Sequence, residues 1–366
     1  MKLYILHEIG APNHYVGLVY WAKKKNITII FREFSILRGI AKGIRYISLD
    51  EVIKAFINLV FLFSLIFQGK KNIVIGIAPF DFRMLYLVKL FARHNLFYHT
   101  SHTTWTDEKV PKNTSFNKLG IIRKSWIGFI KKTAYCFCVT DRSNTELSSF
   151  FKIRKTKTVY HTSGTMSLPN LLRREVQLKE KSIINAKKVS ICLYSGRLVE
   201  QKGVKKIIDL AVKLPDVEFR FAGKGPLESY LIDKSLKMDN LKILGYLDKD
   251  SLKNEYKNAD ILLLPSIKTA TWEELFGISL IEAMSFGVVP FSSNHSGPLE
   301  VITHDFDGFV FSEDDFIELA YNTINILNSN QNKMYKLRIN ALDKSKKFAL
   351  EKVSLLWSDI LEKRLL

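Results

Sequence analysis

The chain has 366 residues, of which 47% are hydrophobic and 25% charged, a composition that excludes a disordered protein and favours two folded domains. Its net charge of +19 is unevenly placed, because residues 1–160 carry +17 and residues 161–366 only +2. Such a basic first half attracts anionic surfaces, including lipid headgroups, nucleic acid and phosphorylated carriers. A generally lysine-rich composition is the alternative explanation, but it predicts similar charge in both halves. The three cysteines lack the spacing of a disulfide framework, which favours a reducing compartment.

Short apolar runs typical of strands alternate with helical patterns along the first half. The N-terminal run ends at His7 and Glu8, too early for a secretory signal peptide. The uncharged run 55–67 would form a helix of about 20 Å, shorter than the ~30 Å hydrocarbon core of a membrane, so we expect a buried or interfacial helix. Capping boxes at Ser48/Glu51 and Ser143/Glu146 are predicted to start two helices. The expected strands are 2–7, 27–33, 72–78, 96–101, 134–140 and 158–162.

The second half repeats this alternation. Its expected strands are 189–195, 217–222, 241–245, 260–265, 288–292 and 309–311, and its expected helices include 203–214 and 275–286. Continuous apolar runs fit strands that are buried on both faces of a parallel sheet. The sequence therefore predicts an α/β protein with two Rossmann-like doubly wound domains that face a cleft. We expect domains at 1–165 and 187–344, a linker at 166–186, and a C-terminal helix at 345–366 that crosses back to the first domain.

The first motif with chemical meaning follows the strand expected at 189–195. Gly196 and Arg197 begin the loop, and Lys202 lies five positions after Arg197, just before Gly203 opens a helix. Two cations in one strand-to-helix loop can clamp a diphosphate with help from the helix N-terminus. A solvated loop is the alternative interpretation of this motif taken alone.

The second motif follows the strand expected at 260–265. Glu274 lies at the start of the next helix, and Glu282 lies about two turns later, roughly 12 Å along the axis. Carboxylates so far apart cannot form a retaining glycosidase pair, which needs about 5–5.5 Å, but they can bracket a long ligand. Gly277 between them lets a phosphate approach backbone amides. The alternatives are that Glu274 only forms a capping box with Thr271 and that Glu282 only lies on an exposed helix face.

Taken in order, these motifs resemble the retaining family-4 glycosyltransferases (glycosyltransferase group 1) of GT-B fold. Supporting segments across residues 189–311 are 221–226, 264–266, 287–290, 297–302 and 307–308. The resemblance implies that Arg197 and Lys202 hold the donor diphosphate, while Glu274 binds the transferred sugar. It further implies that Glu282 binds ribose, and that amides near the phosphates come from Phe276, Gly277, Ile278 and Ser279.

The first half matches this family only in outline. The resemblance implies that His102 lies near the acceptor and the reaction centre, and that Gly10 belongs to an acceptor-side loop. The paired glycines usual in that loop are broken here, since Ala11 follows Gly10. The usual Asn-Gly after the last strand of the first domain is replaced by the segment 161–164, which reads His-Thr-Ser-Gly.

We expect no metal or other cofactor. His99 and His102 lack a nearby carboxylate and a third ligand. The Asp-x-Asp sequences 248–250 and 305–307 lie in connecting segments, where aspartates serve turns and caps. Two cations and a helix N-terminus can offset the charge of a leaving diphosphate without a metal.

The sequence thus predicts a retaining hexosyltransferase that moves a sugar from a nucleotide-sugar donor to a saccharide or lipid-linked acceptor. The basic first half favours a cytoplasmic enzyme, peripheral at the anionic inner face of the cell membrane, in bacterial cell-surface polysaccharide synthesis (O-antigen, capsule or lipopolysaccharide). Alternatives are a nucleotide-sugar epimerase of the same fold, a glycogen-synthase-like polymerase, and a basic nucleic-acid- or lipid-binding protein. We expect no nucleic-acid partner, because aromatic platforms interleaved with cations are missing.

Overall fold

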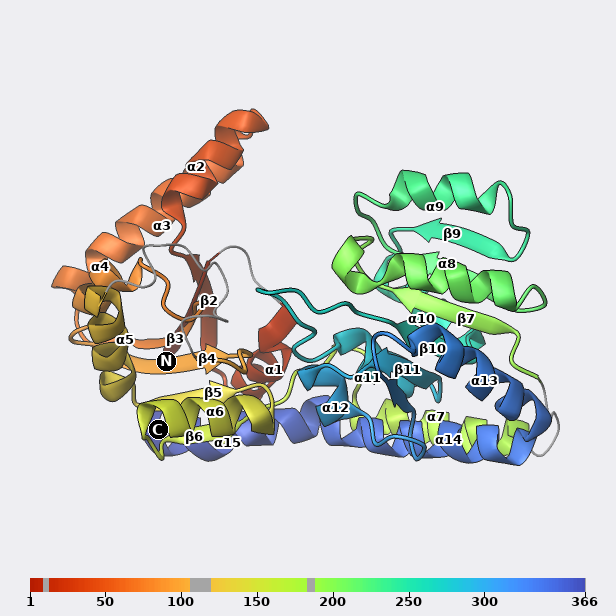
Figure 1. Cartoon of the computed structure of the whole chain (residues 1–366). Helices are drawn as coiled ribbons and strands as arrows, with labels where there is room; N and C mark the ends of the chain where they lie inside the picture. Colours follow the sequence, from red (N-terminus) through yellow and green to blue (C-terminus); the bar gives the residue numbers. More distant parts are fainter. Residues whose placement is uncertain (9–12, 106–119, 183–187, 366) are drawn as a thin grey trace. The chain divides into compact units, whose positions relative to one another are not determined.

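The computed structural model describes residues 1–8, 13–105, 120–182 and 188–365. It divides into two compact units: unit 1 comprises Met1–His161 and Val353–Leu366, and unit 2 comprises Thr162–Lys352. Each unit contains a six-stranded parallel sheet with helices packed around it (Figure 1). The expected α/β fold with two Rossmann-like domains is confirmed.

The sheet of unit 1 has the order β2-β1-β3-β4-β5-β6, with all neighbours parallel. Its strands are β1 (Lys2–His7), β2 (Thr28–Glu33), β3 (Asn72–Gly76), β4 (Asn95–Thr100), β5 (Tyr135–Cys138) and β6 (Thr156–Thr158). The strand order reverses between β1 and β3, so the carboxyl ends of these two strands flank a crevice suited to a ligand. Cys136 and Cys138 of β5 are free thiols in the core, as expected.

The sheet of unit 2 has the order β12-β11-β10-β7-β8-β9, again parallel throughout. Its strands are β7 (Ile191–Ser195), β8 (Glu218–Ala222), β9 (Leu241–Gly245), β10 (Ile261–Leu264), β11 (Val289–Ser293) and β12 (Phe309–Phe311). Strand β10 is buried along its whole length, which explains its unbroken apolar sequence. Here the order reverses between β7 and β10, the two strands that precede the predicted motifs.

The helices of unit 1 are α1 (Val16–Lys24), α2 (Ile36–Arg45), α3 (Leu49–Phe67), α4 (Met84–Leu90), α5 (Gly120–Lys132) and α6 (Asp141–Phe151). Ser48 is the N-cap of α3, as expected, but Ser143 is not the N-cap of α6. Ser48 precedes α3 but its side chain makes no capping hydrogen bond. Helix α6 begins before Ser143, and Thr140 caps it by accepting from the Ser143 N–H at 3.1 Å. No described helix is both long enough and apolar enough to cross a membrane.

The helices of unit 2 are α7 (Leu168–Ser182), α8 (Val204–Lys213), α9 (Glu228–Ser235), α10 (Lys249–Asn258), α11 (Ile278–Met284), α12 (Ser296–Val301), α13 (Phe316–Ser329) and α14 (Gln331–Ser345). Helix α7 occupies most of the segment expected to be a linker, and it belongs to unit 2. The last helix, α15 (Leu350–Leu365), begins later than the expected residue 345 because a 3₁₀ turn, Lys346–Phe348, precedes it. Its residues from Val353 onward belong to unit 1, as expected, and Trp357 packs on Phe137 with ring centroids 4.3 Å apart.

Candidate active site

In unit 2 the loops after β7 and β10 meet at the point where the strand order reverses. Gly203 ends the first loop with a φ of +68°, and a Cβ at this position would lie 1.7 Å from the carbonyl oxygen of Pro265. The Ile267 N–H donates to the carbonyl of Gln201 at 2.9 Å. The glycine and this hydrogen bond therefore hold the two predicted motifs against each other, which is the position expected for a ligand site in a doubly wound sheet.

This contact brings Lys202 and Glu274 together as an ion pair, although they are 72 positions apart in the sequence. Both side chains are largely shielded, with exposed fractions of 15% and 11%. The Lys202 ammonium also lies 5.3 Å from the centre of the Trp272 ring. Glu274 does not cap a helix, since α11 starts at Ile278 and its N-cap is Gly277. The capping-box alternative for Glu274 is therefore wrong.

The backbone of Glu274 is fixed from both sides. Its N–H donates to Nδ1 of His295 at 2.9 Å, and its carbonyl accepts from the Gly297 N–H at 3.0 Å. A Cβ on Gly297 would lie 2.2 Å from the Phe276 nitrogen, so only glycine permits this approach. Burial lowers the pKa of His295, and the hydrogen bond to Nδ1 places the ring proton of the neutral form on Nε2. Sequence reasoning missed His295, for which the only signal is its position just after β11.

Arg197 lies in the same loop as Lys202 but is exposed. Its carbonyl accepts a 2.5 Å hydrogen bond from the Tyr194 hydroxyl, and its guanidinium has no ion pair within the described parts of the chain. The glycines of the segment 221–226 explain how the loop is supported. A Cβ at Gly223 would lie 1.8 Å from the Gly196 carbonyl oxygen, so the loop after β8 can pack directly on the loop that carries Arg197.

The start of α11 follows the loop after β10, which carries Glu274. Gly277 is its N-cap, with a φ of +84°, and no side chain caps the first turn. Phe276 is buried against Phe348, with ring centroids 5.7 Å apart, while Ile278 and Ser279 of the first turn are half-buried. The helix has seven residues, shorter than the expected 275–286, because it begins only after Gly277 and ends before Ser285.

Glu282 lies in the second turn of α11 and faces inward. Its Oε1 accepts from the Ser163 hydroxyl at 2.6 Å, and its Oε2 accepts from the Tyr256 hydroxyl at 3.3 Å. Burial raises the pKa of Glu282 above its usual range, against the opposing effect of these two hydrogen bonds. The alternative that Glu282 only lies on an exposed helix face is wrong.

The two Asp-x-Asp segments have local structural roles. Asp248 caps α10 by accepting from the Ser251 N–H at 2.8 Å. Asp307 is buried and accepts from the Thr303 N–H at 2.7 Å, while Asp305 adopts a positive φ of 57° in the same turn. Over the described residues, no three His, Cys, Asp or Glu side chains are grouped so that they could hold a metal ion.

Unit 1 has a pocket of its own, of about 200 Å³, at the reversal point between β1 and β3. His102 lines it, and the His102 carbonyl accepts from the Ser143 hydroxyl at 2.7 Å. Gly10, the other predicted acceptor-side residue, lies outside the described residues. The pocket is also lined by His7, Glu8, His14 and His99. We call these residues and His102 the histidine pocket.

Burial keeps several of these imidazoles uncharged at neutral pH. It lowers the pKa of His14 to about 4 and holds the pKa of His99 well below its usual range, and it has the same effect on the pKa of His161, whose ring lies beside those two. The rings of His14 and His161 stack with centroids 4.6 Å apart. Sequence reasoning selected only His102 from this group, because the others converge only through the strand order of the sheet.

The family described as glycosyl transferases group 1 has a model that matches residues 176–344. The match covers a little under half of the chain and shows that this segment is similar to group 1 glycosyl transferases. It contains Arg197, Lys202, Glu274 and Glu282, so the motifs that predicted the family lie within the matched residues.

The curated relatives share about a third of their length with this chain. The amylovoran biosynthesis glycosyltransferase AmsK of Erwinia amylovora is 35% identical over 134 residues, which are 34% of this chain and 33% of AmsK. The uncharacterized glycosyltransferase MJ1607 of Methanocaldococcus jannaschii is 33% identical over 122 residues, 32% of this chain and 30% of that protein.

Solved structures resemble the chain over nearly its full length. HepE of Anabaena in complex with UDP has a TM-score of 0.67 at 17% identity, covering 99% of this chain and 100% of HepE. Sucrose-phosphate synthase from Thermosynechococcus elongatus also has a TM-score of 0.67, at 14% identity, covering 99% of this chain and 98% of its own. These likenesses confirm the expected GT-B fold.

Proposed function

We propose that this chain is a retaining hexosyltransferase whose nucleotide-sugar donor binds where the strand order of unit 2 reverses. The observation that carries the proposal is the shielded pair of Lys202 and Glu274, which joins the two predicted motifs in one site. A shielded cation beside a carboxylate suits a diphosphate next to a sugar hydroxyl, since charged hydrogen bonds are strongest away from water. The HepE structure in complex with UDP-glucose supports this choice of donor class.

In the proposed reaction, the acceptor hydroxyl attacks the anomeric carbon from the same face that the nucleoside diphosphate leaves. The bond from carbon to the diphosphate oxygen breaks as the new glycosidic bond forms, and the hydroxyl proton passes to the departing phosphate. Lys202 and Arg197 offset the charge that develops on the leaving group. Such electrostatic stabilisation is usually the largest single contribution to catalysis. No step uses a metal or another cofactor.

The two carboxylates, Glu274 and Glu282, position the donor. Glu274 accepts a hydrogen bond from the transferred sugar, and its fixed backbone keeps the carboxylate in place before the donor arrives. Glu282 accepts from the ribose hydroxyls, which join or replace the Ser163 and Tyr256 hydroxyls that now contact it. Backbone N–H groups at the start of α11, which no side chain caps, donate hydrogen bonds to the phosphates.

Unit 1 takes the saccharide or lipid-linked acceptor, with the histidine pocket on the acceptor side. AmsK is named for amylovoran biosynthesis, and WcaL of Escherichia coli, 31% identical over 133 residues, for colanic acid biosynthesis. Together with the +17 charge of residues 1–160, these names support a bacterial enzyme of cell-surface polysaccharide synthesis. We place it in the cytoplasm, peripheral at the anionic inner face of the membrane.

A panel of nucleotide sugars tests the proposal. A true donor at 100 times its dissociation constant should stabilise the fold by about 2.7 kcal/mol, which a thermal-shift assay detects. With a saccharide acceptor present, chromatography should then show a glycosylated product and a nucleoside diphosphate. An epimerised nucleotide sugar without transfer would instead establish the epimerase alternative, and the absence of stabilisation by every nucleotide sugar would contradict the donor site.

A further inference from the structure

An apolar groove lies in unit 1 between α2, α3 and the start of α4. Its volume of about 680 Å³ is well within the range of small-molecule sites. The walls come from all three helical segments and include Ile36, Leu59, Phe63, Ile66, Phe82 and Tyr86. Arg38 and Arg83 are the only charged residues among its described lining residues.

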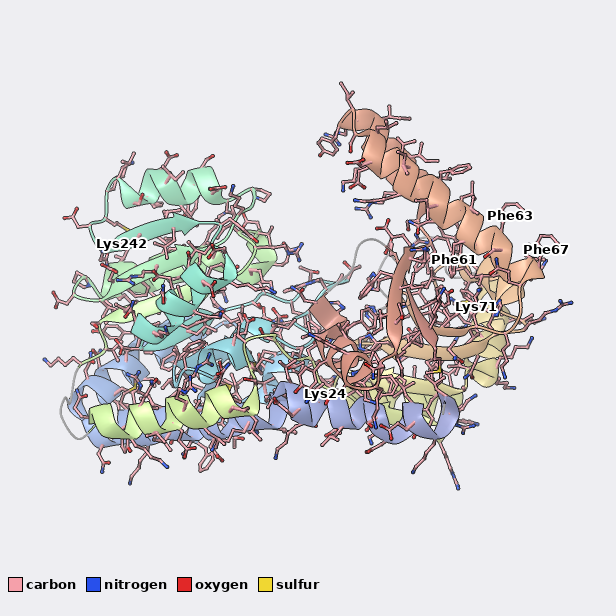
Figure 2. All side chains as sticks on the ribbon, turned by 180° about the vertical axis from the view of Figure 1, so that it is seen from behind. Lys24, Phe61, Phe63, Phe67, Lys71 and Lys242 are labelled. Atoms are coloured by element: carbon pink, nitrogen blue, oxygen red, sulfur yellow. The ribbon has the colours of Figure 1, made fainter. Side chains whose placement is uncertain are left out.

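The helices around the groove expose large apolar side chains. The inner side of α3 is part of the core of unit 1, where Phe61 stacks on Tyr4 with ring centroids 5.0 Å apart. Phe63 and Phe67 project from the outer side of the same helix (Figure 2) and are 61% and 80% exposed. Leu37 of α2 is also mostly exposed. Apolar surface of this extent marks a site for an apolar partner.

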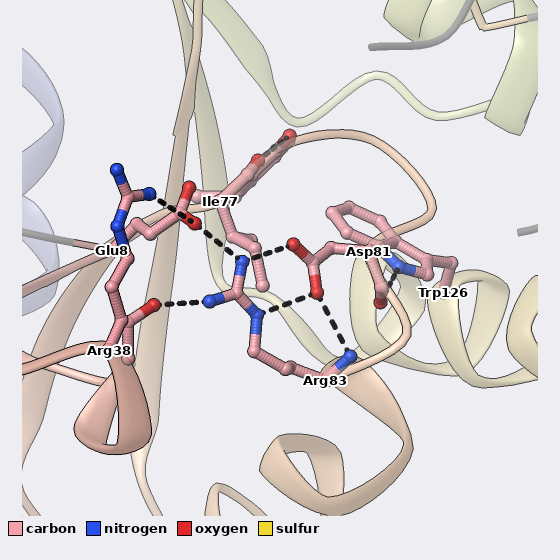
Figure 3. Close-up of polar contacts among 8 residues, drawn as sticks. Glu8, Arg38, Ile77, Asp81, Arg83 and Trp126 are labelled. Atoms are coloured by element: carbon pink, nitrogen blue, oxygen red, sulfur yellow. Dashed lines mark hydrogen bonds and ion pairs between the residues drawn. The ribbon is translucent and has the colours of Figure 1, made fainter. Parts of the chain in front are cut away.

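Arg38 and Arg83, which line the groove, belong to a network of ion pairs (Figure 3). The Arg83 guanidinium donates from Nε to Asp81 at 2.8 Å and from Nη2 to Glu8 at 3.0 Å. Nη1 of Arg38 on α2 comes no closer than 3.9 Å to the same Glu8 oxygen, and the Arg38 side chain is 69% exposed. Arg83 is therefore engaged by Asp81 and Glu8, whereas Arg38 can bind an additional anionic group.

Glu8 connects the groove to the histidine pocket. It lines that pocket beside His7 and His102, and it also pairs with the two arginines that line the groove. A ligand that occupied both spaces would need an apolar chain, an anionic group beside Arg38 and a polar end among the histidines.

We propose that the groove binds the hydrocarbon chain of a lipid-linked acceptor, with its anionic linkage beside Arg38 and its saccharide toward the histidine pocket. This inference rests on the proposed function and assigns the acceptor to the lipid-linked class. Residues 36–71, which span the two helices and the turn after them, carry six Lys or Arg against two acidic residues, which favours an anionic lipid. Contact with a bilayer surface alone would account for Phe67 but leaves the junction of groove and polar pocket unexplained.

Photocrosslinking of the full chain tests this occupant. The probe is dodecyl phosphate with a diazirine at the end of its chain, used below the concentration at which it forms micelles. We expect crosslinks on groove residues of α2, α3 and α4, with competition by unlabelled dodecyl phosphate but not by inorganic phosphate. Leu59→Trp, which fills the groove, should weaken binding at least about tenfold, because it displaces several methylenes.

Two further variants distinguish binding of the ligand's hydrocarbon chain from binding of its anionic head group and from contact with a bilayer. Arg38→Ala should weaken dodecyl phosphate binding and leave binding of the neutral dodecyl maltoside unchanged. Phe67→Ser is the matched control on α3, since Phe67 is exposed outside the groove, and it should leave probe binding intact. Stabilisation of each variant by a nucleotide-sugar donor shows that it is folded.

Other outcomes overturn the inference. Crosslinks on Phe67 and other α3 residues that do not line the groove, or equal losses in Phe67→Ser and Leu59→Trp, would mean that the bilayer surface is the partner. A dimer that Leu59→Trp dissociates, without binding of the probe, would mean that a second copy covers the groove. If the wild-type chain binds a nucleotide-sugar donor but not the probe, this inference fails while the proposed function stands; if it binds no donor, the proposed function itself fails.

Discussion

Glu282 illustrates, at the scale of single residues, how a residue of the proposed donor site can lower stability. Its raised pKa means that the folded state holds a proton more tightly than the unfolded state does. The stabilising contribution of that proton is present below the usual pKa of 4.5 and is lost as the pH rises through the folded-state value. At neutral pH the buried carboxylate is therefore a destabilising charge, kept in place by two hydroxyl donors.

Glu282→Gln should consequently raise the unfolding temperature at about pH 7 and have little effect at about pH 4, because the wild-type carboxyl is then protonated in the folded state. Scanning calorimetry at both pH values measures this. The same variant should bind the nucleotide-sugar donor more weakly, since an amide is a poorer acceptor for ribose hydroxyls than a carboxylate is. A variant that is less stable at neutral pH would contradict the assigned origin of the pKa shift.

Single residues also show what the sequence could predict of the site. Lys202 and Glu274 were identifiable because each belongs to an ordered motif, and the reversal of strand order supplies the reason that they meet. His295 and the histidine pocket carry no motif of their own. His14 and His161 stack only because the strands of unit 1 bring distant segments together, which no local pattern records.

At the scale of elements, the packing of the two loops in unit 2 depends on glycine. Gly203 and Gly245 have nearly the same positive φ, +68° and +66°, but their surroundings differ. A Cβ at Gly203 meets the Pro265 backbone at 1.7 Å, whereas nothing lies within 4 Å of a Cβ at Gly245. Comparing a Cβ at Gly203 with one at Gly245 therefore distinguishes the cost of a left-handed backbone from the cost of a steric clash.

Gly245→Ala should lower the free energy of unfolding by about 1 kcal/mol, the cost of a left-handed conformation in a residue with a side chain. Gly203→Ala should cost more than this and also weaken donor binding, because the two loops must separate. Urea denaturation and a donor-binding assay on both variants measure the two effects. Equal losses of stability in the two variants would show that the contact with Pro265 is unimportant.

The strands were more predictable than the helices for a physical reason. Strands such as β10 are buried on both faces and therefore appear as unbroken apolar runs. Helix α2, by contrast, is amphipathic, but Gly39 and Gly43 disfavour a helix and its apolar residues Leu37 and Ile44 are exposed. The charge-rich helix α7 was mistaken for a linker because charge alone does not distinguish a solvated helix from a loop.

At the scale of the whole molecule, charge is the dominant feature. Residues 1–160 carry +17, and each cation near an anionic bilayer contributes about 1 kcal/mol within a Debye length of roughly 8 Å at physiological salt. The full chain should therefore sediment with anionic vesicles at low salt and dissociate at high salt, while neutral vesicles retain little. Binding that is insensitive to salt would contradict an electrostatic origin.

The proposed chemistry also makes a prediction about metal. Arg197 and Lys202 supply the charge that a divalent cation supplies elsewhere, and Asp248 and Asp307 are engaged as cap and turn residues. Sugar transfer should therefore persist after exhaustive treatment with a chelator. Complete loss of transfer, restored by magnesium or manganese, would contradict this mechanism.

The central claim is that Lys202 and Glu274 form the donor site, and the rate of sugar transfer by their alanine variants tests it most directly. Lys202→Ala and Glu274→Ala should each lower kcat by about 10²–10³, the usual cost of losing one preorganised stabiliser. Lys205→Ala is the matched control, because it removes the same charge nearby from an exposed pair with Glu200 and should leave the rate nearly unchanged. If the folded Lys202→Ala and Glu274→Ala variants transferred sugar as fast as Lys205→Ala, the assignment of the donor site would be wrong.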